Sequence, residues 1–160
     1  DIQSVGSRTL MFNDMFNQLD INLPCRALCL GARRGEEVEA LRYRGVDAIG
    51  IDLVPIGDHV HKGDMHDLPV WDESVSFIYS NSIDHLLDLG KFASEVQRVL
   101  QSGGIALFHL QIGVWSDEVA NQIDSVDEFA GMFDNMRIID DKSAETFLGG
   151  INRLVIMEKL

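Results

Sequence analysis

The chain has 160 residues, 46% of them apolar, which is enough material to bury one hydrophobic core. Its formal net charge is −13 and its longest basic run is the pair Arg33 and Arg34, so most of the surface would repel a nucleic-acid backbone or an anionic membrane. We therefore expect a single domain, residues 1–160, that binds a small molecule or a protein and no nucleic acid.

Cysteine usage and hydropathy indicate whether the chain carries disulfides or a membrane span and where in the cell it is expected. Cys25 and Cys29 lie beside and inside an apolar stretch, away from any Cys/His cluster, and we interpret both as reduced packing residues. No apolar stretch reaches the roughly 20 residues that span a bilayer, and no signal peptide opens the chain, so no membrane contact is expected. A cytoplasmic location is favoured, but because the chain starts at Asp1 rather than Met, an earlier leader or anchor stays possible.

The first part of the chain alternates helical and extended patterns. Residues 1–22 carry apolar side chains at a spacing near 3.6, which predicts an amphipathic helix. Residues 26–30 form an apolar run that is typical of a strand buried on both faces. The pattern of residues 35–44 predicts a helix with one solvent-exposed face. Gly45 is expected to end this helix as a C-terminal cap.

The same patterns continue to the end of the chain. Strands are predicted at residues 46–52, 58–64, 75–79, 105–110, 136–141 and 152–160, and helices at 90–100 and 126–133. About ten residues join the last two strands, which is too short for a parallel crossover, so these two should pair antiparallel. We predict an α/β fold with a doubly wound, mostly parallel sheet of seven strands and an antiparallel hairpin at one edge.

Glycines and polar groups follow four of the predicted strands, at the edge where parallel sheets bind ligands. Gly31 lets the backbone approach a ligand, and the helix that opens at Gly35 directs free N–H groups toward it. Asp52 lies about twenty residues beyond this turn, where a carboxylate can accept both hydroxyls of a ribose. Asp64 can accept from an exocyclic amine such as that of adenine, and Met65 can lie on the ring face.

The fourth strand end completes a candidate site. The backbone carbonyls of residues 80–82 and the Asn81 amide can meet a charged amino-acid tail, so the whole set fits S-adenosylmethionine. The candidate cofactor-binding residues are Gly31, Ala32, Arg33, Gly35, Asp52, Leu53, Asp64, Met65, Ser80 and Asn81. Structural alternatives stay open for four of them: a surface carboxylate for Asp52, a turn residue for Asp64, a core residue for Met65, and a group that holds its own loop for Asn81.

Four stretches occur in a characteristic order: "ALCLGARRGEE", "IGIDLVP", "KGDMHDLPVWDESVSFIYSNSIDHLLD" and "EVQRVLQSGGIALF". With them the chain resembles the class I S-adenosylmethionine-dependent methyltransferases, particularly the small type-11-like branch, from about Arg26 to Leu110. The resemblance implies a Rossmann-like methyltransferase fold with a cofactor-binding core at residues 26–110 and a C-terminal part with the hairpin at 111–160. It also implies that the acid in "GDMHDLP" binds adenine.

The chain departs from the pattern of this family at two positions. Cys29 stands where the family has an acid, and Arg33 stands where it has the middle glycine of G-x-G-x-G. The resemblance implies that the missing acid weakens cofactor binding, because in the family it helps to fix the glycine loop. The turn is similar to that of a plant and algal branch that reads "GAR-x-G".

Methyl transfer from a sulfonium requires alignment and exclusion of water more than it requires a base. For an acceptor with a proton to lose, the candidate general bases are His85, His109 and Asp84. Packing is the alternative role for His85, and His109 at a strand end faces either the cleft or a helix. The other histidines show no metal-site spacing, and no metal is expected.

Two further functions compete with methyl transfer. The first alternative is a cofactor-binding scaffold that is a weak or inactive enzyme. Three observations favour it: the altered first motif, the absence of an insertion that would form a substrate lid, and an exposed-looking N-terminal helix. A nicotinamide-dependent oxidoreductase is disfavoured, because G-x-G-x-x-G is absent and the charges of Glu36 and Glu37 would repel a pyrophosphate. The acceptor and the oligomeric state stay open. The acceptor pocket is expected at the N-terminal segment and at loops that include His85, Gln111 and Trp115.

Overall fold

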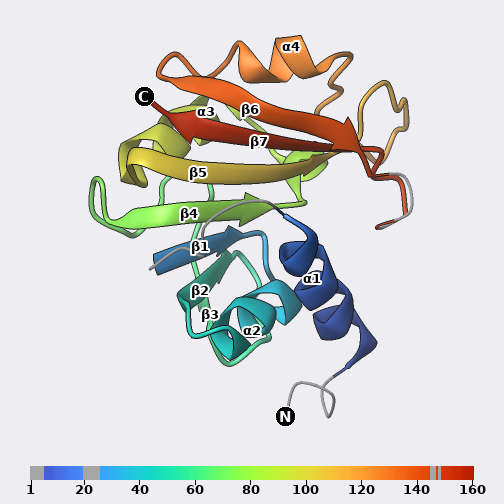
Figure 1. The fold of residues 1–160 in the computed structure, drawn as a ribbon. Coiled ribbons are helices and arrows are strands. Elements are labelled where there is room, and N and C mark those ends of the chain that lie inside the picture. The colour runs from blue at the N-terminus through green and yellow to red at the C-terminus, as the bar shows by residue number, and fades with distance from the viewer. Residues whose placement is uncertain (1–5, 20–25, 145–146, 148) are drawn as a thin grey trace.

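The computed structural model describes residues 6–19, 26–144, 147 and 149–160. They form a seven-stranded sheet in the order β3-β2-β1-β4-β5-β7-β6, with helices on both faces (Figure 1). The elements are α1 (Ser7–Gln18), β1 (Arg26–Leu30), α2 (Glu36–Tyr43), β2 (Asp47–Asp52), β3 (Val60–Lys62), β4 (Val75–Ser80), the short 3₁₀ helix η2 (Ile83–His85), α3 (Leu89–Val99), β5 (Leu100–Leu110), α4 (Val126–Ala130), β6 (Met136–Ser143) and β7 (Arg153–Lys159). Cys25 and the end of the predicted N-terminal helix lie outside the described residues.

The pairing of the strands confirms the predicted topology. Strands β1 to β5 pair in parallel, whereas β7 runs antiparallel to both β5 and β6 at one edge. The segment between β6 and β7 is too short to cross the sheet, so the chain can only return beside the strand that it has left. The fold is therefore the doubly wound α/β sheet with an antiparallel edge hairpin that the sequence predicts.

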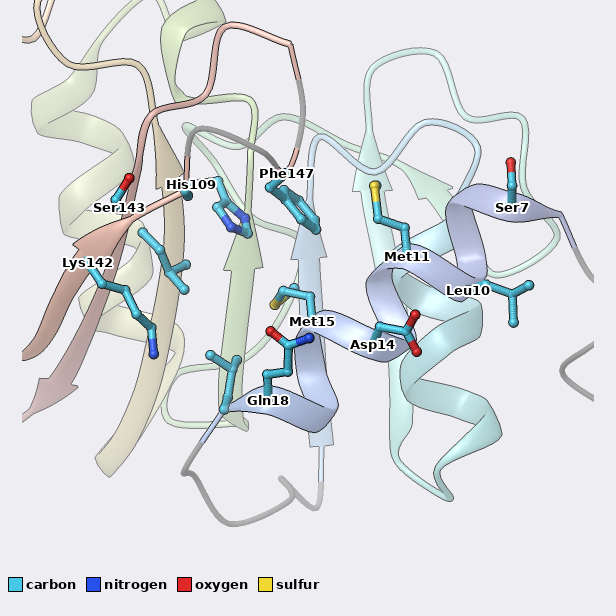
Figure 2. Close-up of a pocket in the computed structure, with 13 residues that line it drawn as sticks. Ser7, Leu10, Met11, Asp14, Met15, Gln18, His109, Lys142, Ser143 and Phe147 are labelled. Atoms are coloured by element: carbon cyan, nitrogen blue, oxygen red, sulfur yellow. The ribbon is translucent and has the colours of Figure 1, made fainter.

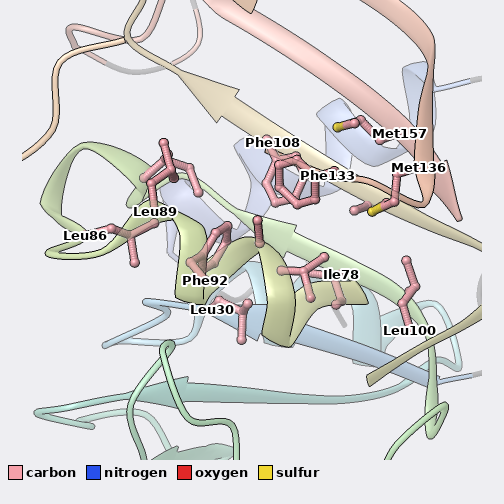
Figure 3. Close-up of a cluster of buried hydrophobic side chains, with 14 of the residues drawn as sticks. Leu30, Ile78, Leu86, Leu89, Phe92, Leu100, Phe108, Phe133, Met136 and Met157 are labelled. Carbon is pink, nitrogen blue, oxygen red and sulfur yellow. The ribbon is translucent and has the colours of Figure 1, made fainter. Parts of the chain in front are cut away.

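The central strand β1 is covered on both faces, because its side chains alternate between two hydrophobic cores. Leu28 and Leu30 belong to the core under α3, and Ala27 and Cys29 belong to the core under α1 and α2. Figure 3 shows the first core, where Phe92 from α3 meets Phe108 from β5. The continuous apolar run of β1 is the sequence signature of this double burial.

Helix α1 packs on the sheet through its buried face, as its amphipathic pattern predicts, so it is not the exposed helix that would favour a scaffold. Phe12 and Phe16 are buried, and their rings meet Tyr79 of β4 edge-on at centroid distances of 5.7 and 5.8 Å. Such aromatic contacts each contribute about 0.5–1.5 kcal/mol beyond burial. Helix α1 is therefore fixed against the carboxyl-terminal half of the central sheet.

Some element boundaries differ from the sequence prediction. Helix α4 ends at Ala130 rather than at residue 133, and β5 starts at Leu100 rather than at residue 105. The register between β4 and β5 shifts between Val75 and Phe77, so "QSGG" forms an irregular part of β5 that precedes the predicted strand. Gly45 ends α2 with a φ of 82°, as its predicted capping role requires.

Among the described residues, no helix is both long enough and apolar enough to cross a membrane.

Candidate cofactor site

A cavity of about 530 Å³ opens where β1, β2 and β3 end. It is lined by Gly31, Arg33, Asp52, Leu53, Val54, Gly63, Asp64, Met65, His66, Ser82, His85 and Leu87. The parallel sheet brings these residues together, because the carboxyl ends of parallel strands meet at one edge. The structure thus gathers most of the residues that the sequence analysis selected at separate strand ends.

The turn after β1 is built from three left-handed residues. Gly31 and Gly35 have φ values of 71° and 77°, as expected for the two glycines of the turn. Arg33 also lies in the left-handed region, with a φ of 39°. Arg33, at the position of the family's middle glycine, therefore adopts a backbone conformation that is uncommon for a residue with a side chain.

Gly31 is needed for close approach as well as for its conformation. A Cβ atom at this position would lie 2.6 Å from Ser82 Oγ, inside any real contact. Ser82 Oγ donates a hydrogen bond to the Gly31 carbonyl at 3.3 Å. The end of β4 therefore closes directly onto the turn after β1.

Asp52 is held by two backbone donors, one from each side. Its Oδ2 atom accepts from the Arg33 N–H at 3.0 Å and its Oδ1 atom accepts from the Val54 N–H at 2.8 Å. An ionised carboxylate offers about four acceptor sites, so each oxygen keeps capacity for one more donor. The carboxylate is fixed in orientation and still able to accept two hydroxyl groups.

Asp64 is oriented by its neighbour His66, a residue that the sequence analysis did not select. Asp64 Oδ1 accepts from the His66 backbone N–H at 2.8 Å and lies 2.7 Å from His66 Nδ1. The backbone hydrogen bond from His66, followed by its side-chain hydrogen bond, lowers the pKa of Asp64. His66 Nε2 accepts from the Asp88 N–H at 3.1 Å, so the neutral ring carries its proton on Nδ1.

Four of the selected residues do not line the cavity. Ala32 and Ser80 are buried, and Ser80 Oγ donates to the Leu30 carbonyl at 3.0 Å. Asn81 Oδ1 accepts from Ser82 Oγ at 3.3 Å, and Gly35 opens α2. In this structure these four residues shape the loops around the cavity.

Sequence reasoning missed four lining residues, Val54, Gly63, His66 and Leu87, and considered Ser82 only for its backbone carbonyl. A sequence signal existed for two of the four, because Gly63 and His66 lie inside the quoted "KGDMHDLP". Val54 and Leu87 carry no such signal, because apolar side chains become cavity walls only through the tertiary arrangement.

Glu37 is a buried acid next to the turn, with 3% of its surface exposed. Burial raises its pKa to about 8, with smaller effects from its own backbone N–H and from Glu36. Burial, followed by the nearby Glu37, also raises the pKa of the Cys29 thiol. Glu37 is therefore largely uncharged at neutral pH. Of the two acids expected to repel a pyrophosphate, only Glu36 then contributes a negative charge.

The two candidate bases lie in different places. His85 lines the cavity, with its side chain 68% exposed and Nε2 3.5 Å from Asp84. His109 is 2% exposed and lines a different cavity, and its Nδ1 atom lies 2.8 Å from the Tyr79 hydroxyl. Burial lowers the pKa of His109 to about 3, so its imidazole is neutral at physiological pH.

Within the described ranges, His, Cys, Asp and Glu side chains form no group of three or more that could hold a metal ion.

Strand order, the antiparallel edge and the cavity at the carboxyl ends define the class: this is a class I S-adenosylmethionine-dependent methyltransferase fold. Residues 28–108 match the family described as a methyltransferase domain, and the chain belongs to this family. No curated protein sequence matches the chain significantly.

Solved structures share this fold at low sequence identity. A chain in the complex of the Haloferax volcanii Trm112 methyltransferase activator with a candidate methyltransferase is 16% identical, with a TM-score of 0.74 over 95% of this chain and 90% of that one. Geranyl diphosphate C-methyltransferase from Streptomyces coelicolor A3(2), in complex with Mg²⁺, geranyl diphosphate and S-adenosyl-L-homocysteine, is 16% identical, with a TM-score of 0.70 over 95% and 77%. A candidate sarcosine dimethylglycine methyltransferase from Galdieria sulphuraria is 15% identical, with a TM-score of 0.71 over 96% and 85%.

Proposed function

We propose that the cavity at the ends of β1, β2 and β3 binds S-adenosylmethionine and that the chain transfers its methyl group to a small-molecule or protein acceptor. The observation that carries this proposal is the pair of oriented carboxylates, Asp52 and Asp64, in one cavity beside a left-handed turn. Two fixed acceptors in a cavity with apolar walls match a nucleoside, which offers ribose hydroxyls, an amine and a flat ring.

Asp52 serves the ribose in this proposal. The backbone N–H groups of Arg33 and Val54 already fix its two oxygens, so hydroxyl binding needs no further ordering of the side chain. Fixed groups bind more tightly because less conformational entropy is lost on binding.

In this proposal, Asp64 and Met65 bind the adenine ring. Asp64 Oδ1 is occupied by His66, and the other oxygen stays available for an exocyclic amine. Met65 lines the cavity beside it, where a polarisable thioether can lie against a ring face. The exposed apolar side chains of Leu53, Val54 and Leu87 also line the cavity, and a bound base would cover apolar surface that water now contacts.

The chemistry supplied by the cofactor is an electrophilic methyl group on a sulfonium. The acceptor's lone pair forms the new bond to carbon, the carbon–sulfur bond breaks with its electron pair staying on sulfur, and S-adenosylhomocysteine remains. The protein aligns the two reactants and excludes water, which supplies much of the rate in such displacements. His85 is the base candidate on the cavity wall, and its exposed ring can pass a proton to solvent.

A cofactor-binding scaffold without turnover is the second candidate function. One observation favours it: the position that holds an acid in the family is the buried, uncharged Cys29, whose thiol pKa is raised by burial. A buried neutral thiol makes weaker hydrogen bonds than a carboxylate, so it holds the turn and the methionine end less firmly. In this case the chain would bind the cofactor and transfer no methyl group.

Calorimetric titration with S-adenosylhomocysteine and with NAD tests the proposal. We expect binding of S-adenosylhomocysteine, and for Asp52→Ala at least tenfold weaker binding. Asp134→Ala, which removes an exposed carboxylate outside the cavity, is the matched control and should bind as the wild type does. Binding of NAD alone, or an unchanged affinity in Asp52→Ala, would refute the proposed site. If S-adenosylhomocysteine binds and a broad acceptor screen gives no methylated product, the scaffold function is favoured.

A further inference from the structure

Glu37 is a buried acid that the steps of methyl transfer described above do not use. It is the second residue of α2 and belongs to the buried stripe of this helix, whose other members are the apolar Val38, Ala40 and Leu41. A carboxyl group at such a position loses its hydration, which destabilises the folded chain unless the group is neutral or paired. Acids perturbed in this way are concentrated at functional sites.

The carboxyl group of Glu37 lies near the next-to-last residues of β1 and β4. Burial, followed by the nearby Glu37, raises the pKa of both the Cys29 thiol and the Tyr79 hydroxyl. Cys29 and Tyr79 are register partners on these two adjacent strands. Since Cys29 stands where the family has an acid, Glu37 brings a carboxyl group from α2 to the place where β1 lacks one.

The order of the strand ends decides where the amino-acid tail of the cofactor lies. In the sheet order β3-β2-β1-β4, Asp64 follows β3 and Asp52 follows β2. The proposed function puts adenine at Asp64 and ribose at Asp52, and the tail is attached to the ribose on the side away from the base. The tail therefore continues over the ends of β1 and β4, where Gly31 and Ser82 line the same cavity.

The space beyond β4, on the side of β5, does not belong to this site. A separate cavity of about 560 Å³ lies there beside α1, lined by Met11 and Met15 of the helix and by His109 and Phe147 (Figure 2). It shares no lining residue with the cofactor cavity. The tail therefore stays on the near side of β4, beside the turn after β1 and the start of α2.

The charges around Glu37 favour a cation. After burial and its own backbone N–H, the groups that act on the pKa of Glu37 are Glu36, which raises it, Arg8 on α1, which lowers it, and Asp52, which raises it. Arg8 lies 3.9 Å from Glu36 and is half exposed, so solvent and Glu36 weaken its effect. The thiol and the hydroxyl on β1 and β4 are neutral, because burial raises the pKa of each. An ammonium group would be attracted by the remaining carboxylates.

We propose that Glu37 is a cofactor-binding residue that accepts a hydrogen bond from the ammonium group of the S-adenosylmethionine tail, in place of the acid that the family carries at the position of Cys29. The inference rests on the function proposed above. On binding, Glu37 releases its proton to solvent, because a carboxyl group next to a cation is favoured in its ionised form. The ion pair holds the tail at the start of α2 and leaves the methyl group free for transfer.

Calorimetric titration of the whole chain with three ligands tests this assignment. S-adenosylhomocysteine carries the complete tail, 5′-(3-aminopropylthio)-5′-deoxyadenosine keeps the amine and lacks the carboxylate, and 5′-methylthioadenosine lacks both. Glu37→Gln should weaken the binding of the two amines at least tenfold and leave the affinity for 5′-methylthioadenosine unchanged. Glu36→Gln, at the adjacent and more exposed position, is the matched control and should bind all three as the wild type does.

Proton release gives a second readout that a purely structural role would not change. The pKa of Glu37 is about 8 before binding, so at pH 7 the carboxyl group is protonated in the free chain and ionised in the complex. Titrations in phosphate and in imidazole buffer, which differ in ionisation enthalpy, should show release of about one proton per S-adenosylhomocysteine bound by the wild type. Glu37→Gln should release none.

Three results would overturn this inference and leave the proposed function standing: an unchanged affinity of Glu37→Gln for S-adenosylhomocysteine, an equal loss of affinity for 5′-methylthioadenosine, or the same proton release in variant and wild type. No binding of S-adenosylhomocysteine by the wild type would overturn both. Removing a buried ionisable group should not unfold the chain, and urea denaturation of Glu37→Gln checks that weaker binding is not caused by unfolding.

Discussion

The backbone N–H of Arg33 donates a hydrogen bond of 3.0 Å to Asp52 Oδ2, which ties the turn after β1 to the end of β2. Arg33 makes this contact in a left-handed conformation with a φ of 39°. The interaction uses only the backbone, and the Arg33 side chain is exposed. Arg33 therefore holds Asp52 through its backbone alone, in a conformation that strains the backbone locally.

Arg33→Gly should relieve this strain. A non-glycine residue in the left-handed region costs about 1–2 kcal/mol, and the extra freedom of glycine in the unfolded chain offsets about 0.5–1 kcal/mol of the gain. We expect the free energy of unfolding to be unchanged or to rise by up to about 1 kcal/mol, with the hydrogen bond to Asp52 retained. Urea denaturation measures the change.

Arg34→Gly is the matched control, because Arg34 is the adjacent exposed residue and does not have a positive φ. It should lower the free energy of unfolding by about 0.5–1 kcal/mol. An equal loss of stability in both variants would show that Arg33 is not strained.

Glu37 should make the chain less stable as the pH rises. Its pKa is about 8 in the folded chain, against 4.5 for an unperturbed glutamate, so between these values only the folded state holds the proton. The unfolded state binds fewer protons in this window, so the free energy of unfolding falls from pH 4.5 to pH 8. Glu37→Gln should remove this fall and raise stability by at least about 1 kcal/mol at pH 8, with little effect near pH 4.5.

Thermal or urea unfolding of Glu37→Gln across this pH range makes the measurement. Glu36→Gln, at the neighbouring and more exposed position, is the control and should show no comparable gain at pH 8. A Glu37→Gln curve parallel to that of the wild type would contradict a raised pKa.

His109 should act in the opposite direction at acidic pH. Burial lowers its pKa from 6.5 to about 3, so between these values the unfolded state binds the extra proton. The free energy of unfolding therefore falls as the pH drops from 6.5 to 3. NMR of the ring protons should show a neutral imidazole at pH 5. A protonated His109 at that pH would contradict its burial beside α1.

His109→Gln should remove this part of the acid destabilisation, since the amide does not titrate and can still meet the Tyr79 hydroxyl. His85→Gln, which changes an exposed histidine, is the matched control variant.

His66→Ala should weaken the binding of S-adenosylhomocysteine. The variant removes the Nδ1 hydrogen bond to Asp64 and the acceptor for the Asp88 N–H, so the Asp64 carboxylate loses its fixed orientation. We expect a loss of about fivefold to thirtyfold, which corresponds to roughly 1–2 kcal/mol for one hydrogen bond to a charged group. Calorimetry measures this loss, and His61→Ala on β3, outside the cavity, should bind normally. A normal affinity in His66→Ala would mean that Asp64 does not depend on its neighbour.

The strand ends of the candidate site could be read from the sequence because each is a local signal. An apolar run followed by Gly31, or by Asp52 some twenty residues later, marks a buried strand and the polar group at its end. Parallel topology then requires these groups to meet, and the structure brings Gly31, Asp52 and Asp64 to one cavity. The relation to the plant and algal branch stays a prediction.

Two features of the site could not be predicted from the sequence, because they depend on contacts between distant segments. The left-handed conformation of Arg33 follows from hydrogen bonds of its N–H to Asp52 and of its carbonyl with Ile56 and Gly57, which no local propensity indicates. The role of His66 requires the Asp88 N–H to reach its Nε2 atom from the start of α3.

The sequence by itself determined the order of strands and helices, the antiparallel edge and the carboxylates at the strand ends, since periodicity, linker length and turn residues act over short distances. Only the tertiary structure decided which polar groups are charged and which cavity each one faces. Burial keeps Glu37 and His109 largely neutral near pH 7, and the fold places His109 at a second cavity, because desolvation depends on what covers a side chain rather than on its neighbours in the chain.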